Sequence, residues 1–85
     1  MTTHLPPEEV SFLSEAELEA LLISHPNFNT FWESHAPLLI VRTPPSMRDP
    51  LCEIQLVWDL GSRLETYCWL WIDARNGEIV RQFPE

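Results

Sequence analysis

Residues 66 to 73 have the sequence Thr-Tyr-Cys-Trp-Leu-Trp-Ile-Asp, and this segment decides the fold. Its even and odd positions form two apolar rows, one with Tyr67, Trp69 and Trp71 and the other with Cys68, Leu70 and Ile72. Successive side chains of a strand point to opposite faces of the sheet, so the segment predicts an interior strand that is apolar on both sides. A single layer of helices can cover only one of the two rows.

The residues on either side of this segment predict an antiparallel meander. Apolar and polar residues alternate from Leu51 to Asp59, as is typical of a half-buried strand. Asn76-Gly77 favours a tight turn because both residues tolerate positive φ. The expected strands cover residues 38–41, 51–59, 66–73 and 78–83, with a Pro-rich loop over 44–50 and a turn over 61–63.

Helix signals precede the strands. Ser14 and Glu17 have the spacing of a capping box, in which each side chain accepts a hydrogen bond from the other residue's backbone N–H. Apolar residues at helical spacing then predict a helix from Ser14 to about Ser24, which Pro26 ends. A second short helix is expected after Asn27, as far as Pro37.

The chain therefore predicts an α+β fold with one or two N-terminal helices packed on an antiparallel sheet of three to four strands. Its 85 residues suffice for one domain. We expect an irregular leader over residues 1–13 and a single α+β domain over residues 14–85.

The two cysteines, Cys52 and Cys68, are expected to be buried free thiols. If the hairpin between their strands turns near Ser62, Cys68 lies across from residue 56 or 57. The two Cα atoms are then roughly 13 Å or more apart, whereas a disulfide needs them within about 7 Å.

The register of this hairpin also decides which apolar row faces the helices, since a shift of one residue exchanges the two faces. We favour the register that buries the aliphatic row, because exposed Tyr and Trp among polar neighbours are typical of protein interfaces. That register places Tyr67, Trp69 and Trp71 among Glu53, Gln55, Glu78 and Gln82. In the alternative register the aromatic row is buried. The leader, the Pro-rich loop or a homodimer partner could also cover the second face.

Charge limits the choice of partner. Thirteen carboxylates face five cations, the net charge is −8, and the first 41 residues contain no Arg or Lys. Such a chain repels polyanions, so we expect no direct binding to nucleic acid or to an anionic membrane. No apolar stretch is long enough to span a bilayer, and the N-terminus has no signal-peptide pattern, which predicts a cytoplasmic protein.

The first helix carries Glu15, Glu17 and Glu19. Two interpretations remain open for these residues. They could attract a basic partner, as in acidic inhibitors that imitate nucleic acid and in immunity-type inhibitors. Alternatively they form a solvated helix face, whose early Glu residues the helix dipole favours.

No pattern in the sequence indicates catalysis, a cofactor or a metal. His4, His25 and His35 have no zinc-ligand spacing, and His25 and His35 are expected at helix C-termini, where an imidazolium favours the carbonyl end. Asp59 and Asp73 are expected to serve their own turns. Glu65 is a further carboxylate near a turn, and the only glycines are those at the two predicted turns. We expect a protein that is not an enzyme.

Residues 51 to 83 resemble the PepSY domain family. The resemblance is carried by Val57-Trp58-Asp59, by Tyr67 and by residues 71–80, which have the sequence Trp-Ile-Asp-Ala-Arg-Asn-Gly-Glu-Ile-Val. In that family a strand with Trp is followed by a hairpin that closes on a similar Asp-Ala and Gly-Glu pattern. PepSY domains occur in peptidase propeptides, where an inhibitory or chaperone-like role has been proposed.

The sequence thus predicts a small non-catalytic module that binds or inhibits another protein. Its candidate binding residues are Tyr67, Trp69 and Trp71 on the sheet and Glu15, Glu17 and Glu19 on the helix. An acidic inhibitor of a basic protein is the alternative from a second class, and a small enzyme is a third.

Overall fold

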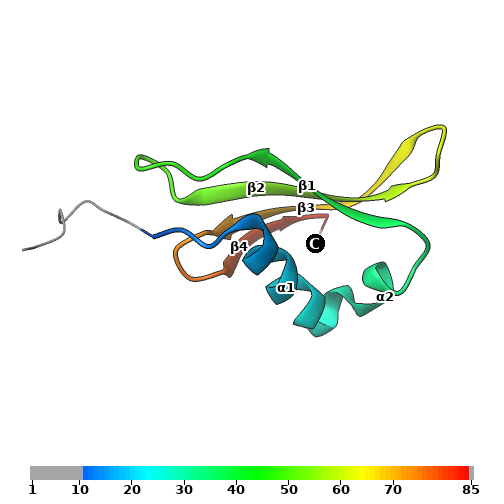
Figure 1. Ribbon diagram of the computed structural model, residues 1–85, viewed down its shortest axis with the longest axis horizontal. Helices are drawn as coiled ribbons and strands as arrows, with labels where there is room; N and C mark the ends of the chain where they lie inside the picture. The colour runs from blue at the N-terminus through cyan, green and yellow to red at the C-terminus, as the bar shows by residue number, and fades with distance from the viewer. Residues whose placement is uncertain (1–10, 85) are drawn as a thin grey trace, which may run out of the picture.

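The computed structural model describes residues 11–84 and has the expected α+β architecture (Figure 1). Helices come first along the chain and lie together on one side of a four-stranded antiparallel sheet. The sheet order is β1-β2-β3-β4, so each strand pairs with its sequence neighbours. The elements are α1 (Glu15–Ser24), η1 (Pro26–Phe28), α2 (Asn29–Trp32), β1 (Pro37–Thr43), β2 (Leu51–Asp59), β3 (Leu64–Asp73) and β4 (Glu78–Phe83).

Helix α1 begins where the sequence predicts it. The Ser14 hydroxyl accepts a hydrogen bond from the Glu17 N–H at 3.1 Å, and the Glu17 carboxylate accepts one from the Ser14 N–H at 2.8 Å. This reciprocal pair satisfies two backbone donors that the first turn would otherwise leave free. The capping box is therefore confirmed.

The second helix is shorter than expected. It consists of the single 3-10 turn η1 followed by α2, which ends at Trp32 rather than near Pro37. Beyond it both the backbone N–H and the hydroxyl of Ser34 donate to the Phe31 carbonyl, and Ala36 adopts a positive φ of 56°. The chain therefore leaves the helix after Trp32, turns sharply, and enters β1 at Pro37.

The strands agree closely with the sequence pattern. β2 and β4 have the predicted bounds, whereas β1 and β3 are longer than predicted at one or both ends. Leu56 pairs with Cys68, as the predicted hairpin register requires. Cys52 pairs with Ile72, so the two cysteines lie four residues apart along the sheet and are free.

The core lies between the helices and one face of the sheet. α1 contributes Leu18 and Leu22, and the following turns contribute Phe28 and Phe31, all buried. The sheet supplies the aliphatic rows of its central strands, namely Cys52, Ile54, Leu56, Cys68, Leu70 and Ile72, each at most 1% exposed. Apolar burial on this side is the main favourable term in folding.

An aromatic cluster closes one end of the core. The Phe31 ring lies 5.1 Å from Tyr67, 4.9 Å from Trp32 and 5.9 Å from Trp58, measured between ring centroids. The Trp58 indole N–H donates to the Ser34 hydroxyl, so this ring is fixed by a hydrogen bond as well as by packing. Phe31 is the centre of the cluster and is fully buried.

Tyr67 belongs to this cluster, so its expected place beside Trp69 and Trp71 is wrong. The register shifts where Leu56 pairs with Cys68 and Val57 pairs with Thr66, which leaves Tyr67 as the extra residue of a β-bulge. A bulge gives two residues of one strand a single partner and rotates the side chains that follow. The Tyr67 ring consequently turns to the helix side and stacks on Phe31.

The β3–β4 turn anchors the N-terminal segment to the sheet. The Leu13 N–H donates to the Ala74 carbonyl at 2.8 Å, and the Ala74 N–H donates to the Pro50 carbonyl at 2.9 Å. Gly77 has φ +80°, and a Cβ atom there would lie 2.5 Å from the Leu21 side chain. The positive φ favours glycine at this turn, and a larger residue would also have to displace the end of the Leu21 side chain.

Replacing Phe31 with Ala should lower the free energy of unfolding by about 3–5 kcal/mol, because it removes a buried ring and leaves a cavity at the centre of the aromatic cluster. Urea denaturation followed by tryptophan fluorescence measures this change. Phe83→Ala is the matched control, since Phe83 is 56% exposed and its loss should cost about 0.5 kcal/mol. Equal losses in the two variants would show that the core is not where the fold places it.

Candidate protein-docking face

Trp69 and Trp71 lie on the face of the sheet that the helices do not cover. Trp69 pairs with Gln55 and Trp71 with Glu53, whereas Leu70 between them pairs with Ile54 in the core. Both Trp side chains are half-buried. The register that was favoured from the sequence is therefore confirmed for these two residues.

Two rows of side chains cross the whole sheet on this face. Directly paired residues of antiparallel strands point to the same side, so the register of the strands defines the rows. The first row is Ile40, Gln55, Trp69 and Phe83, and the second is Thr43, Glu53, Trp71 and Arg81. We call this surface the open face; its half-buried or exposed apolar side chains include Leu38, Ile40, Trp69, Trp71 and Phe83, and Arg42 and Arg81 lie beside them.

The centre of the open face is organised by hydrogen bonds. The Gln55 side chain accepts from the Arg42 Nε at 2.7 Å and donates to the Thr66 hydroxyl at 2.6 Å. Gln55 is only 7% exposed and Val57 beside it is 0% exposed, although no helix lies over them. Side chains of the same face must shield these two positions, which makes the surface preorganised rather than loose.

A cation–π contact fixes one of the indole rings. The Arg81 guanidinium lies 4.9 Å from the centre of the Trp71 ring. Such contacts contribute about 0.5–1 kcal/mol at exposed sites and more when water is excluded. Trp and Arg are also the residues in which binding energy at protein interfaces is concentrated.

Arg81 and Phe83 were missed by sequence reasoning, which placed Gln82 beside the two Trp residues. Glu78, which was expected on the same face, pairs with Asp73 and does lie there. The register shifts between Trp71 and Ile72, and Gln82 pairs with Leu70 on the helix side. An unbulged hairpin around Asn76-Gly77 would have put Gln82 opposite Trp69. The extra residue in β4 moves Arg81 and Phe83 into the aromatic rows instead.

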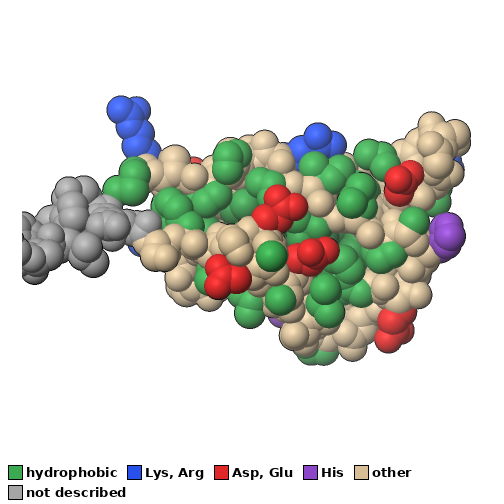
Figure 2. Space-filling view, viewed as in Figure 1, with side chains coloured by type: hydrophobic (Ala, Val, Ile, Leu, Met, Phe, Trp, Pro, Cys, Tyr) green, Lys and Arg blue, Asp and Glu red, His purple; other side chains and the backbone are tan. Residues whose placement is uncertain are grey.

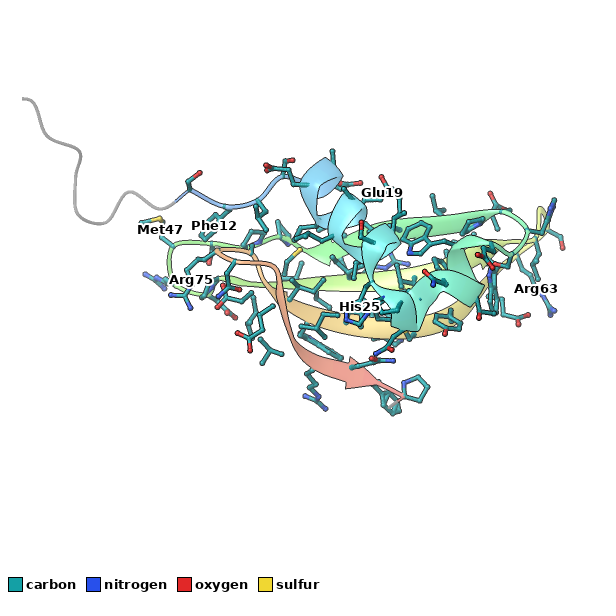
Figure 3. The ribbon with its side chains drawn as sticks, turned by 90° about the horizontal axis from the view of Figure 1, so that it is seen from below. Phe12, Glu19, His25, Met47, Arg63 and Arg75 are labelled. Carbon is teal, nitrogen blue, oxygen red and sulfur yellow. The ribbon has the colours of Figure 1, made fainter. Side chains whose placement is uncertain are left out.

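The edges of the sheet are poor docking sites by comparison. β1 has a register shift between Val41 and Thr43, and β4 has one near Val80. Bulges and charged residues at edges interrupt the regular row of backbone donors and acceptors that a new strand would need. The loop after β1 extends past one end of the sheet, where Met47 lies, and Arg63 in the β2–β3 turn lies at the other end (Figure 3).

The helix side is acidic. Figure 2 shows carboxylates gathered over α1, whereas the cationic side chains in that view lie along the upper rim. Glu15 and Glu17 are exposed and Glu19 is half-buried. Glu17 is already engaged in the capping box, so of the three candidate residues only Glu15 and Glu19 have carboxylates that α1 itself does not use.

The carboxylates near the hairpin turns have structural partners. Asp59 accepts from the Gly61 N–H at 2.9 Å, and Asp73 accepts from the Arg75 N–H at 3.0 Å, which confirms the predicted turn roles. The Arg75 guanidinium also binds Asp73, with its closest contact at 2.7 Å, and these hydrogen bonds lower the pKa of Asp73 to about 2. Glu65 lies 3.5 Å from Arg63 in an exposed ion pair.

The histidines of the described chain take separate positions. His25 is at the C-terminus of α1, as predicted, but its Nδ1 accepts a hydrogen bond from the Asn27 N–H and so caps the next turn. His35 lies beyond the end of α2, and His4 is outside the described residues. Residues 11–84 contain no group of three or more His, Cys, Asp or Glu side chains arranged to hold a metal ion.

Both thiols are embedded in the core. Burial raises the pKa of Cys68 to about 11, and burial followed by the nearby Glu15 charge raises the pKa of Cys52. A thiol acts as a nucleophile only as the thiolate, and neither side chain is exposed by more than 1%. The two cysteines therefore serve packing.

Among residues 11–84, no helix has the length and apolar character needed to cross a membrane.

No protein-family model matches the chain, and neither the curated proteins nor the solved structures contain a significant match.

In the native protein both cysteines should react slowly with a thiol reagent at pH 8, because the raised pKa values leave little thiolate and the core excludes the reagent. In urea both should react at the rate of a free thiol. Ellman's reagent, added with and without urea, measures the two rates. Rapid labelling of either cysteine in the native state would contradict the packing of β2 against β3.

The low pKa of Asp73 predicts a defined acid response. A carboxyl whose folded pKa lies below its ordinary value of 3.8 stabilises the fold above that value, and the contribution is lost as pH falls towards 2. The gap in melting temperature between wild type and Asp73→Asn should therefore be largest above about pH 5 and close towards pH 2. Glu33→Gln, an exposed carboxylate on the helix side, is the control and should show a small gap throughout.

Proposed function

We propose that this chain is a small non-catalytic protein-binding module that docks another protein on its open face. The observation that carries the proposal is the placement of Trp69 and Trp71, half-buried, on a sheet face that neither helix covers. Large aromatic side chains held in place but not fully buried lose little entropy when they bind. They retain apolar surface that contact with a partner would remove from water.

The surroundings of the two rings support the same function. Arg81 stacks on Trp71, and the Arg42–Gln55–Thr66 hydrogen bonds hold the centre of the face. An aromatic centre with Arg and a polar network matches the composition of interface cores. The resemblance of residues 51–83 to PepSY domains, for which an inhibitory role has been proposed, agrees with a binding or inhibitory module.

The acidic α1 takes a secondary role in this proposal. Glu15 and Glu19 would steer a basic partner toward the protein and raise its association rate. In the alternative function, an acidic inhibitor that imitates nucleic acid, the same carboxylates would supply most of the affinity. Engagement of Glu17 in the capping box favours the aromatic face as the main source of affinity.

Photo-crosslinking in the native lysate tests the proposal. Wild type and Trp69→Ser/Trp71→Ser are compared, and the crosslinked proteins are identified by mass spectrometry. We expect a defined product that is lost at least tenfold in the double variant, on the scale of truncating two interface anchors worth about 1–2 kcal/mol each. Ile23→Ser/Met47→Ser removes exposed apolar surface elsewhere and should retain the product.

Salt distinguishes the two functions. Binding through the aromatic face should persist as ionic strength rises, whereas binding through carboxylates should collapse. Glu15→Gln/Glu19→Gln should slow association with little effect on dissociation. Equal crosslinking by wild type and the Trp double variant, together with loss of binding in the Glu double variant, would replace the proposed function by the acidic-inhibitor alternative.

A further inference from the structure

The open face and the helix side differ in their pattern of charge. The open face carries both signs, since Arg42 and Arg81 lie on it with Glu53 and Glu78. The helix side presents carboxylates, and the chain contains no cation before Arg42. A surface with both signs can be complementary to itself, whereas a surface with one sign repels its own copy.

We propose that the protein docked on the open face is a second copy of this chain, in a symmetric dimer formed sheet against sheet. The inference rests on the proposed function, because it names the partner of the same surface. In a two-fold interface each contact occurs twice, with residue i of one copy against residue j of the other. Arg81 of one copy can then approach a carboxylate of the other, and the reciprocal contact follows by symmetry.

Repulsion between the net charges of the two copies is weaker in a dimer formed through the open faces than in one formed through the helix sides. Each copy carries −8, so association through the helices would bring the uncompensated carboxylates together. Sheets pack about 10 Å apart and a helix layer adds about 10 Å on each side. The acidic helices of the two copies would then be on the order of 30 Å apart, several times the screening length of about 8 Å at physiological salt.

The size of the face is also adequate. β2 and β3 have 9 and 10 residues and the edge strands β1 and β4 have 7 and 6, so four strands about 4.8 Å apart make a face roughly 19 Å wide and about 30 Å long at its centre. A stable interface buries about 800 Å² of accessible surface per partner, so the dimer uses the whole of this corrugated face. Two Trp side chains near its middle occupy the position where binding energy is usually concentrated.

Sedimentation equilibrium across a broad concentration range tests the dimer. Wild type should sediment as a reversible species of twice the chain mass of 9.9 kDa. Trp69→Ser/Trp71→Ser should be monomeric. Circular dichroism melts verify that each variant is folded. A wild type that remains a monomer at every concentration, or a dimer unaffected in the folded Trp variant, would overturn the inference.

Charge variants keep the test valid if the Trp double variant does not fold. Arg81→Glu and Glu53→Arg each give the face an excess of one sign and should raise the dimer dissociation constant about tenfold or more. Because both residues flank Trp71 in one row, the combined Glu53→Arg/Arg81→Glu chain restores the balance and should recover much of the affinity. Glu33→Arg changes the charge equally on the helix side and should leave the dimer intact. Unchanged dimerisation in both single variants would overturn the inference.

The two proposals fail in different ways. A monomeric wild type whose crosslinked product is a different protein, lost in the Trp double variant, overturns the second copy and leaves the binding module intact. The binding module itself is overturned if wild type forms no dimer and also gives no other crosslinked product that depends on Trp69 and Trp71.

Discussion

The structure depends on one constraint, which is that β3 has apolar side chains on both faces while the helices within residues 11–84 cover only one of them. Leu70 and its neighbours of the aliphatic row face α1 and the following turns and are almost completely buried. Trp69 and Trp71 face the other way and keep part of their surface. Residues 11–84 form no second layer over these two rings, and small domains bury a limited fraction of their surface. The open face follows from the placement of both helices on one side of the sheet.

The β-bulges decide which residues accompany the two Trp rings. A bulge moves Tyr67 to the helix side, where it completes the aromatic cluster around Phe31 and closes the end of the core. A second bulge moves Arg81 and Phe83 onto the open face. The first change improves burial, and the second gives the exposed aromatics a cation and an apolar neighbour. One bulge therefore contributes to core packing, and the other sets the composition of the candidate surface.

The distribution of charge follows from the order of the elements along the chain. The helices come from the part of the chain without Arg, whereas β2, β3 and β4 come from the part that contains the Arg residues, and β1 spans the boundary between the two parts. Packing the helices on one face thus separates an acidic side from a mixed aromatic side. The carboxylates that would attract a basic partner lie on the helix side, and the apolar side chains that would contact a partner lie on the open face. Substitutions can therefore alter the two properties independently.

The sequence by itself determined the order of the elements, the capping box at Ser14, the Asn76-Gly77 turn, the free cysteines and the two-sided character of β3. These features depend on local patterns that neighbouring residues complete. Tertiary structure alone decided that Tyr67 is packed against Phe31, that Arg81 stacks on Trp71, and that the second helix ends at Trp32. The position of a β-bulge is determined by the packing of side chains that are distant in sequence. The alternation of apolar and polar residues along a single strand does not indicate that position.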